Sequence, residues 1–500
     1  MSTDWINHIG NWNPQFLREC RGHLKPRSVI AAVGTSVLLQ VLLILSQTSV
    51  YNDIRISARN IFQILTWTLP YFLLVVGGYY LVNDLAQEEK RGTLNFIRLS
   101  PRPAKEILLG KLLGVPILPY LIVLSAVPLH IWATWQAQVS ILFLVSYYGL
   151  LIATAILCFS LALLTGITHQ LRPKQTPASI AFAALGLFLF APGLMFWNTN
   201  LIWHHFENAD RAFYLNSSPI SISWLYINLT NNSLINHGFV LLNLAIMTGF
   251  VWKMLERLFY QPRATLLSKR LSYSLTAYLN VLSWGFFQNN QGWDSITAFA
   301  LLYGANFALM LLLISTLTPQ RQQLFDWLSS HQSNVTTRLW NDKSPAVTAV
   351  GVNILIACAL MVPWSILIAQ AELPLAYLLL MPVSVALSWL TYAAIAQLIF
   401  ITKVRTPTMW AAGTLILWIF VPLIVLALFQ KGNPPAALWM TYRTVFGYPF
   451  YEYPQAGFFQ AAVVGVGLQS VFLAGLLVLL KQRLDKLRRS VSDPRLPSAQ

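Results

Sequence analysis

The chain has 500 residues, of which 56% are hydrophobic and only 10% are charged. A soluble domain usually carries about 25% charged residues, so this composition excludes a mostly soluble chain and places most of it in lipid. The formal net charge of +16 indicates the basic bias of cytoplasmic loops rather than nucleic-acid binding, because the basic residues are split among loops and show no stacking platform. We therefore expect an all-α, polytopic membrane helical bundle.

Residues 1–27 predict a cytoplasmic amphipathic helix before the first span. Asn13 can cap a helix whose first residue is Pro14, where the missing N–H of proline costs nothing. A helix lying on the membrane surface fits the apolar spacing, and an ordinary capping helix is the alternative. The start of the chain, with Asp4 and aromatic residues, predicts no cleaved signal peptide. The apolar residues at helical spacing are Trp5, Ile6, Ile9, Trp12, Phe16 and Leu17.

Crossing the hydrocarbon core takes about 20 apolar residues, and this rule predicts about twelve spans in two sets of six. The first set falls at 28–47, 61–83, 108–131, 139–167, 178–197 and 236–257. The second set falls at 272–288, 294–317, 347–369, 374–401, 408–429 and 457–480. The segment 272–288 is short and contains polar residues, so a re-entrant segment is the alternative there.

Charge favours the crossing at 272–288. With that crossing both termini are cytoplasmic, and only five of the 33 Lys and Arg residues lie outside. Without it, the loop that holds Arg321, Arg338 and Lys343 would lie outside together with the basic tail. The positive-inside rule therefore supports twelve spans. The five outside residues are Arg55, Arg59, Arg211, Lys431 and Arg443.

The two halves resemble a weak internal repeat. Ser100-Pro101 precedes a span in the first half, and Ser344-Pro345 precedes one in the second. The second connection lacks the Glu-Glu and Gly-Thr-Leu sequences of the first, so the second copy is degenerate if it is a copy, and a chance resemblance is the alternative. The expected parts are the N-terminal helix (1–27), a first six-span domain (28–260), a second, divergent six-span domain (261–480) and a basic cytoplasmic tail (481–500).

The most informative stretch runs from Leu81 to Leu113, between the second and third spans. Its charged groups can meet a soluble partner, Gly92 allows a turn, and an apolar face can seat on the partner or on the membrane; a solvated loop is the alternative. Lys111 is expected to snorkel to lipid phosphates. In order, the stretch contains Asp84, Glu88, Glu89, Lys90, Arg91, Gly92-Thr93-Leu94, Phe96, Ile97, Leu99, Ser100-Pro101 and Leu108-Leu109-Gly110-Lys111.

These motifs, in this order and place, resemble those of the type-2 permeases of ATP-binding-cassette transporters. The resemblance covers roughly residues 1–260, and over the second half it is carried by topology and the Ser-Pro pair. It implies a channel-forming subunit of an exporter in the cell inner (plasma) membrane, surrounded by lipids, acting as a homodimer or pseudo-dimer and docked on a cytoplasmic ATP-binding subunit. The coupling residues that it implies are Glu88, Glu89, Arg91, Gly92, Thr93, Leu94, Ser100 and Pro101.

The sequence lacks the phosphate-binding loop that nucleotide hydrolysis needs. Gly110-Lys111 is followed by Leu112 instead of Ser or Thr, and it introduces a predicted span. We therefore expect a chain that is not itself an enzyme and holds no cofactor, with ATP hydrolysis in a partner. Its cargo is unassigned, although the aromatic content of the spans suits an amphipathic or lipid-like molecule.

Two other functions compete with an exporter. A secondary carrier usually places ionisable residues within its spans as relays, and here the predicted spans are nearly free of charge. A membrane scaffold without transport is the third reading. His130 and His169 stand alone at span ends and are expected to be interfacial, without a catalytic partner. No metal site is expected, because His204-His205 with Glu207 and Asp210 lack a fixed ligand spacing.

Overall fold

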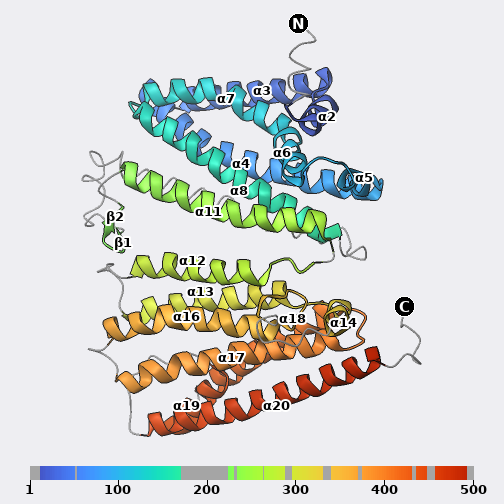
Figure 1. Cartoon of the computed structure of the whole chain (residues 1–500). Helices are drawn as coiled ribbons and strands as arrows, with labels where there is room; N and C mark the ends of the chain where they lie inside the picture. The colour runs from blue at the N-terminus through green and yellow to red at the C-terminus, as the bar shows by residue number, and fades with distance from the viewer. Residues whose placement is uncertain are drawn as a thin grey trace. The chain divides into compact units, whose positions relative to one another are not determined.

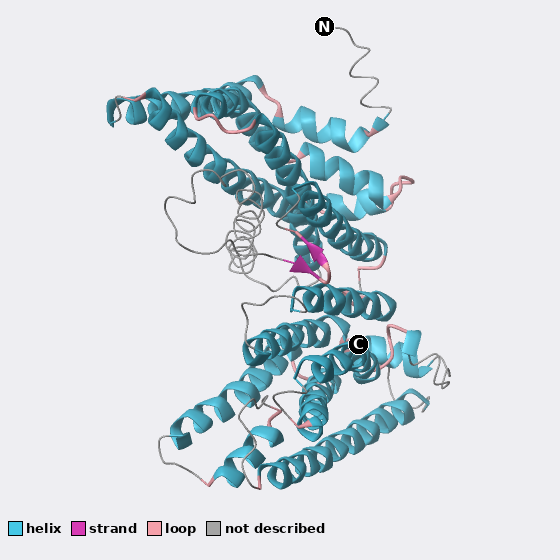
Figure 2. Ribbon diagram, turned by 90° about the vertical axis from the view of Figure 1, so that its left-hand side faces the viewer, coloured by secondary structure: helices cyan, strands magenta, loops and turns pink. Residues whose placement is uncertain are grey.

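A computed structural model describes residues 12–50, 53–170, 223–229, 233–262, 264–287, 295–329, 339–369, 374–430, 435–447 and 457–492. These residues are almost entirely helical (Figure 2). The exceptions among the described elements are two short strands, β1 (Ser223–Trp224) and β2 (Ile227–Asn228), which pair in a small hairpin. The chain is therefore an all-α protein, as its composition predicts.

The chain divides into two compact units. Unit 1 comprises residues 1–222 and 228–264, and unit 2 comprises residues 223–227 and 265–500. The described helices of unit 1 are α2 (Pro14–His23), α3 (Pro26–Val50), α4 (Ile54–Lys90), α5 (Thr93–Arg98), α6 (Ala104–Gly114), α7 (Ile117–Gln136), α8 (Ile141–Gln170) and α11 (Ser233–Tyr260). Those of unit 2 are α12 (Lys269–Phe287), α13 (Ser295–Leu317), α14 (Arg321–Ser329), α16 (Ala346–Ala369), α17 (Leu375–Ile401), α18 (Pro407–Gln430), α19 (Ala436–Val445) and α20 (Phe458–Ser492).

Unit 1 is built around α4. This helix packs against α3, α7 and α8, and α8 also packs against α11 (Figure 1). The core side chains of α4, among them Ile61, Phe62, Leu74 and Leu81, are fully buried. The short helix α2 lies on α6, so the N-terminal helix that the sequence predicts is attached to the rest of unit 1 by α6.

Unit 2 is built around α17. This helix packs against α13, α16, α18 and α20, while α12 lies along α16 and α19 lies on α20. The small residues Ala393, Ala394 and Ala396 of α17 are buried, which allows the helix backbones to approach closely.

Helices that hold corresponding positions along the two units pack in the same pattern. In unit 1 the packed pairs include α3–α4, α3–α7, α4–α7, α4–α8 and α8–α11. In unit 2 the pairs at the same places in chain order are α12–α13, α12–α16, α13–α16, α13–α17 and α17–α20. Each unit on its own therefore shows one scheme of helix packing.

Ten of the described helices are long and apolar enough to cross a membrane: α3, α4, α7, α8, α11, α13, α16, α17, α18 and α20. Each overlaps a span that the sequence predicts. Of the remaining two predicted spans, 178–197 lies outside the described residues. Segment 272–288 forms most of α12, which is helical but is not among the ten.

One predicted span needs a correction. Residues 108–131 do not form a single crossing, because the helix breaks at Pro116. Proline has no backbone N–H to donate to the preceding turn of a helix. The candidate crossing is α7, from Ile117 to Gln136. The first part of the predicted span, including Lys111, belongs to the separate helix α6.

Candidate functional site

The connection between α4 and α7 folds into two short helices. After α4 ends at Lys90, the chain turns through Gly92, whose φ of +71° is a left-handed conformation that suits glycine. The Thr93 hydroxyl donates to the Glu88 carbonyl at 3.1 Å, which fastens the start of α5 to the end of α4. Helix α5 is followed by a turn at Ser100–Pro101 and then by α6.

Lys111 on α6 is the centre of a buried charge network. Its side chain is only 1% exposed, and its Nζ lies 2.6 Å from Asp84 Oδ2 and 2.9 Å from Glu88 Oε2, both on α4. Nζ also lies 3.3 Å from Oε1 of Glu19 on α2. Arg18 of α2 bridges Glu19, at 3.0 Å, and Glu88. These contacts join α2, α4 and α6 through charge-assisted hydrogen bonds.

Glycine residues of α6 let α2 approach closely. A Cβ atom on Gly110 would lie 2.6 Å from Asn13 Oδ1 and 2.8 Å from the Phe16 backbone nitrogen, and one on Gly114 would lie 2.5 Å from Glu19 Cβ. Asn13 Oδ1 accepts a hydrogen bond from Phe16 N at 2.9 Å, which confirms the predicted cap of this helix. The Leu-Gly-Lys sequence therefore provides both the space for α2 and the cation that holds it.

The network favours the charged forms of Lys111 and Glu19. Burial alone would lower the pKa of Lys111, but Asp84, Glu19 and Glu88 outweigh burial and raise it. Burial likewise opposes ionisation of Glu19, yet Lys111 and Arg18 hold the pKa of this carboxyl below its ordinary value. The predicted snorkelling of Lys111 is therefore wrong, because the ammonium group is buried among carboxylates and is not extended toward solvent.

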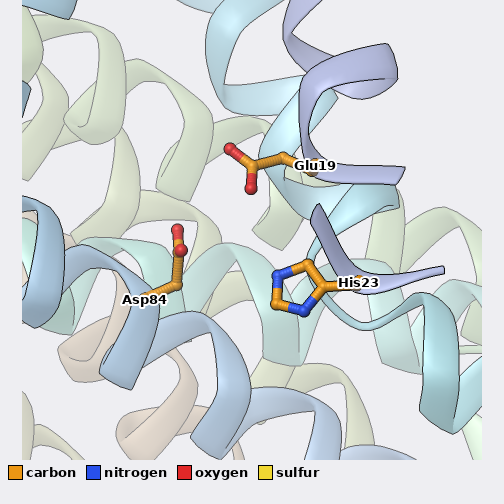
Figure 3. Close-up of side chains that lie close together, drawn as sticks. All are labelled: Glu19, His23 and Asp84. Carbon is orange, nitrogen blue, oxygen red and sulfur yellow. The ribbon is translucent and has the colours of Figure 1, made fainter. Parts of the chain in front are cut away.

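Glu19, His23 and Asp84 place one possible metal-ligand atom each within 4.8 Å of one another (Figure 3). The Lys111 ammonium group already binds the Glu19 and Asp84 carboxylates. A metal ion would have to displace this lysine, so the geometry favours an ion-pair network over a metal site. The other residues considered for metal binding, 204–210, lie outside the described residues.

The structure separates the predicted coupling residues. Glu88 is 7% exposed, and its carboxylate faces Lys111 and Arg18, so it is not on the surface for a soluble partner as the sequence predicted. Arg91, Gly92, Thr93 and Pro101 are exposed, while Ser100 is half-buried. For Glu89 and Leu94 the structure describes the backbone but not the side chain.

Two large apolar side chains, one on α5 and one directly after its last residue, Arg98, are exposed. Phe96 is 79% exposed and Leu99 is 84% exposed, whereas Ile97 is buried against the rest of unit 1. Phe96 and Leu99 are three residues apart, a spacing that places side chains on the same face of a helix. We call this pair, with the exposed Arg91 beside it in sequence, the α5 surface.

Helix α11 contacts the same region but leaves the α5 surface open. The Tyr260 hydroxyl accepts a hydrogen bond from Ala104 N at 2.9 Å. Glu256 lies 3.4 Å from Lys105, and the Arg98 guanidinium lies 6.0 Å from the centroid of the Phe259 ring. These contacts involve the start of α6 and the far side of α5.

His130 on α7 does not stand alone, contrary to the prediction from the sequence. It is fully buried, with Nε2 3.2 Å from Thr66 Oγ1 on α4 and Nδ1 2.9 Å from the Tyr148 hydroxyl on α8. Tyr147 also donates to the Thr66 carbonyl at 2.9 Å. Its surroundings make His130 a polar junction of three candidate spans. His169 lies at the end of α8, where the structure does not describe its side chain.

The ten apolar helices define an integral, multi-pass membrane protein. Comparison with known proteins gave no matching family model, no similar curated protein and no similar solved structure.

Proposed function

We propose that this chain is the permease subunit of an ATP-binding-cassette exporter, powered by a separate ATPase that docks on the α5 surface. In this proposal the chain crosses the inner membrane twelve times in two sets of six, with both termini and α5 in the cytoplasm. The cargo is an amphipathic or lipid-like molecule, moved by alternating access.

The observation that carries the proposal is the exposure of Phe96 and Leu99. Both lie in a connection rich in charged residues, between two helices able to span a membrane. When several large apolar side chains are exposed on one face of a protein, that face is often an interaction site. Aromatic side chains that fill pockets are typical anchors of protein interfaces. The neighbouring Arg91 favours a partner with acidic groups around its docking pocket.

The charge network supports the proposal because it joins α2, α4 and α6, and because α5 is attached to α4. Ile97 is buried and Thr93 is bonded to the end of α4, so α5 cannot move independently of that helix. Lys111 ties α4 to α6 and, through Glu19, to α2. A displacement of α5 would therefore move α2, α4 and α6 together, and the break at Pro116 would let this block tilt against α7.

Contacts of α12 support the twelve-span topology. Thr276 of α12 donates to Asn353 Oδ1 of α16 at 2.7 Å, and Asn353 donates to Ser272 at 3.0 Å. Ser272 and Thr276 of α12 thus face a candidate span. A helix whose polar groups are satisfied by its neighbour can cross lipid despite its moderate hydropathy.

The proposal is tested by affinity purification of the full-length, tagged chain from membranes of its natural host, in mild detergent. We expect a protein with a phosphate-binding loop to co-purify with the wild type and to be lost from Phe96→Glu/Leu99→Glu. Val404→Glu is the matched control, because Val404 is an exposed apolar residue of a different connection, between α17 and α18. Retention of the same ATPase by the double variant would reject the α5 surface as its docking site.

An ion-coupled secondary carrier is the second candidate, and His130 is the observation that favours it. An ionisable residue buried between spans is a common proton relay. Each variant is expressed in a host strain that lacks the wild-type chain, and transport of the cargo is measured. If the chain is a carrier, His130→Gln abolishes transport, and Phe96→Glu/Leu99→Glu leaves it intact. We expect the opposite result for the exporter, because both ring nitrogens of His130 have structural partners that Gln can partly replace.

A further inference from the structure

The α14 helix is the counterpart of α5 in unit 2. Helix α5 lies between α4 and α7 in the chain, and α14 lies between the corresponding helices of unit 2, α13 and α16. These surrounding helices pack in the same scheme in both units. If the two units had equivalent docking faces, α14 would also expose apolar side chains.

The apolar side of α14 is instead covered by unit 2 itself. Leu324 is fully buried in a cluster with Leu480 and Leu487 of α20. Phe325 and Leu328 are packed against the same cluster and are partly buried. The exposed residues of α14 are the polar Gln322, Asp326 and Ser329.

The cover comes from the C-terminal part of α20, residues 480–489, which we call the α20 extension. With a rise of about 1.5 Å per residue, the 35 residues of α20 extend about 52 Å, while the 28 residues of α11, its counterpart in unit 1, extend about 42 Å. The last turns of α20 carry Leu484 and Leu487 against α14. Helix α11 ends at Tyr260, beside the start of α6, and leaves Phe96 and Leu99 exposed.

The outer side of this α20 extension is basic. Its exposed residues include Asp485 and five cations, so the extension remains solvated while its leucines stay on α14. The five cations are Lys481, Arg483, Lys486, Arg488 and Arg489.

We infer that, of the two connections compared and within their described residues, only the one in unit 1 offers an apolar docking site for the ATPase, and that the α20 extension occupies the equivalent face of unit 2. This inference rests on the proposed function, since it concerns the same partner. It makes the two units functionally unequal: a force from the ATPase enters through α5, and α14 is fixed to its own unit by α20.

Among the described residues of the connection between α13 and α16, Trp340 is a large exposed aromatic side chain that could serve a second docking site. It is 49% exposed and lies in the same connection as α14. However, its ring packs against Tyr273, with centroids 5.7 Å apart, and against the Arg270 guanidinium at 5.4 Å. These contacts hold the indole against α12.

The test uses the photo-crosslinking amino acid p-benzoylphenylalanine, placed in the full-length chain at Phe96, at Gln322 or at Trp340. The chain is irradiated in membranes of its natural host, and each adduct is identified by mass spectrometry. We expect an ATPase adduct from position 96 and at least about tenfold less from positions 322 and 340.

Comparable ATPase adducts from 322 or 340 would overturn the inference of a single docking site while leaving the proposed function in place. The absence of an ATPase adduct from all three positions would overturn the proposed function itself. These two failures therefore give different results.

A second measurement tests the cover without an ATPase. Cys20, Cys158 and Cys358 are replaced by Ala, and Leu99→Cys or Leu328→Cys is introduced into the purified chain. We expect a bulky hydrophilic maleimide to label position 99 at least about tenfold faster than position 328, a ratio that corresponds to about 1.4 kcal/mol or more. Equal rates would show that α20 does not cover α14, and would also reject the inference.

Discussion

Lys111 shows how a buried cation can stabilise a junction of three helices. Taking an ammonium group out of water costs several kcal/mol, and this cost is offset only when carboxylates and hydrogen bonds surround it. Asp84 and Glu88 lie four residues apart, on one face of α4, and Glu19 completes the group from α2. Without the Lys111 ammonium group, the three carboxylates would lie close together and repel one another.

Lys111→Ala is therefore expected to destabilise unit 1 by about 3–5 kcal/mol, the usual effect of breaking a buried pair from one side. The measurement is denaturant or thermal unfolding of the purified full-length chain, followed by tryptophan fluorescence. Lys105→Ala is the control, because Lys105 is 70% exposed in its pair with Glu256, and exposed pairs contribute about 0–1 kcal/mol. Equal effects of the two variants would contradict the account of the network.

Acid is expected to release α2. The pKa of Glu19 is lowered by folding, so its contribution to stability is present above the ordinary value of 4.5 and is lost as pH falls through the lowered value. The pKa of Lys111 is raised, so its contribution is complete below 10.5 and is lost only as pH rises through the raised value. The network is thus intact at neutral pH.

Hydrogen exchange of the α2 amides tests this expectation. Protection should be constant from neutral pH down to about 5 and fall below 4.5, after correction for intrinsic exchange. Glu19→Gln should reduce this acid-dependent loss. Unchanged protection of α2 well below pH 4.5 would show that Glu19 does not hold the helix.

The sequence allowed some of these residue contacts to be predicted. The cap formed by Asn13 and Pro14 is local and was predicted correctly. The pairing of Lys111 with Glu19 joins residues 92 positions apart, so spacing within one helix could not show it. The four-residue interval between Asp84 and Glu88 was the available signal that a cation would pack against that face of α4.

Among the elements, α6 depends on glycine for its contact with α2. Gly110→Ala is expected to push α2 away, because the new Cβ would lie 2.8 Å from the Phe16 backbone nitrogen. Loss of this contact should make α2 more sensitive to protease. Gly149→Ala on α8 is the matched control, since a Cβ there meets nothing within 4 Å and Ala favours a helix by up to about 1 kcal/mol. Equal protease sensitivity in the two variants would contradict this role of Gly110.

Helix α12 shows why hydropathy alone was not enough to settle its topology. Its polar residues Ser272, Thr276 and Asn280 recur every four positions and are all buried on one side. From sequence, such a stripe is also typical of a helix lying at an interface or re-entering the membrane. Only the contacts of Ser272 and Thr276 with Asn353 reveal that the stripe faces another helix.

At the scale of the whole molecule, the long apolar helices were the most predictable feature. Ten predicted spans overlap apolar helices, because about 20 apolar residues are a strong signal that depends little on distant contacts. The break at Pro116 was missed because the residues on both sides of it are apolar. The shared packing scheme of the units could not be read from the sequence, where only the Ser-Pro pairs suggested a repeat.

The topology is tested by a reporter inserted after Gln291. We expect a non-cytoplasmic signal, because α12 crosses the membrane before this position in the twelve-span proposal. A reporter after Lys343 is the control and should give a cytoplasmic signal. A cytoplasmic signal at Gln291 would show that α12 does not cross, and would place the remaining connections on the opposite sides.

The central claim is that a separate ATPase binds through the α5 surface, and the most direct measurement is the affinity of that contact. The ATPase recovered with the chain would be purified alone and titrated against the full-length chain in lipid nanodiscs. We predict that Phe96→Glu/Leu99→Glu raises Kd at least about tenfold, or about 1.4 kcal/mol, relative to the wild type and Val404→Glu. The same Kd for all three chains would contradict the account.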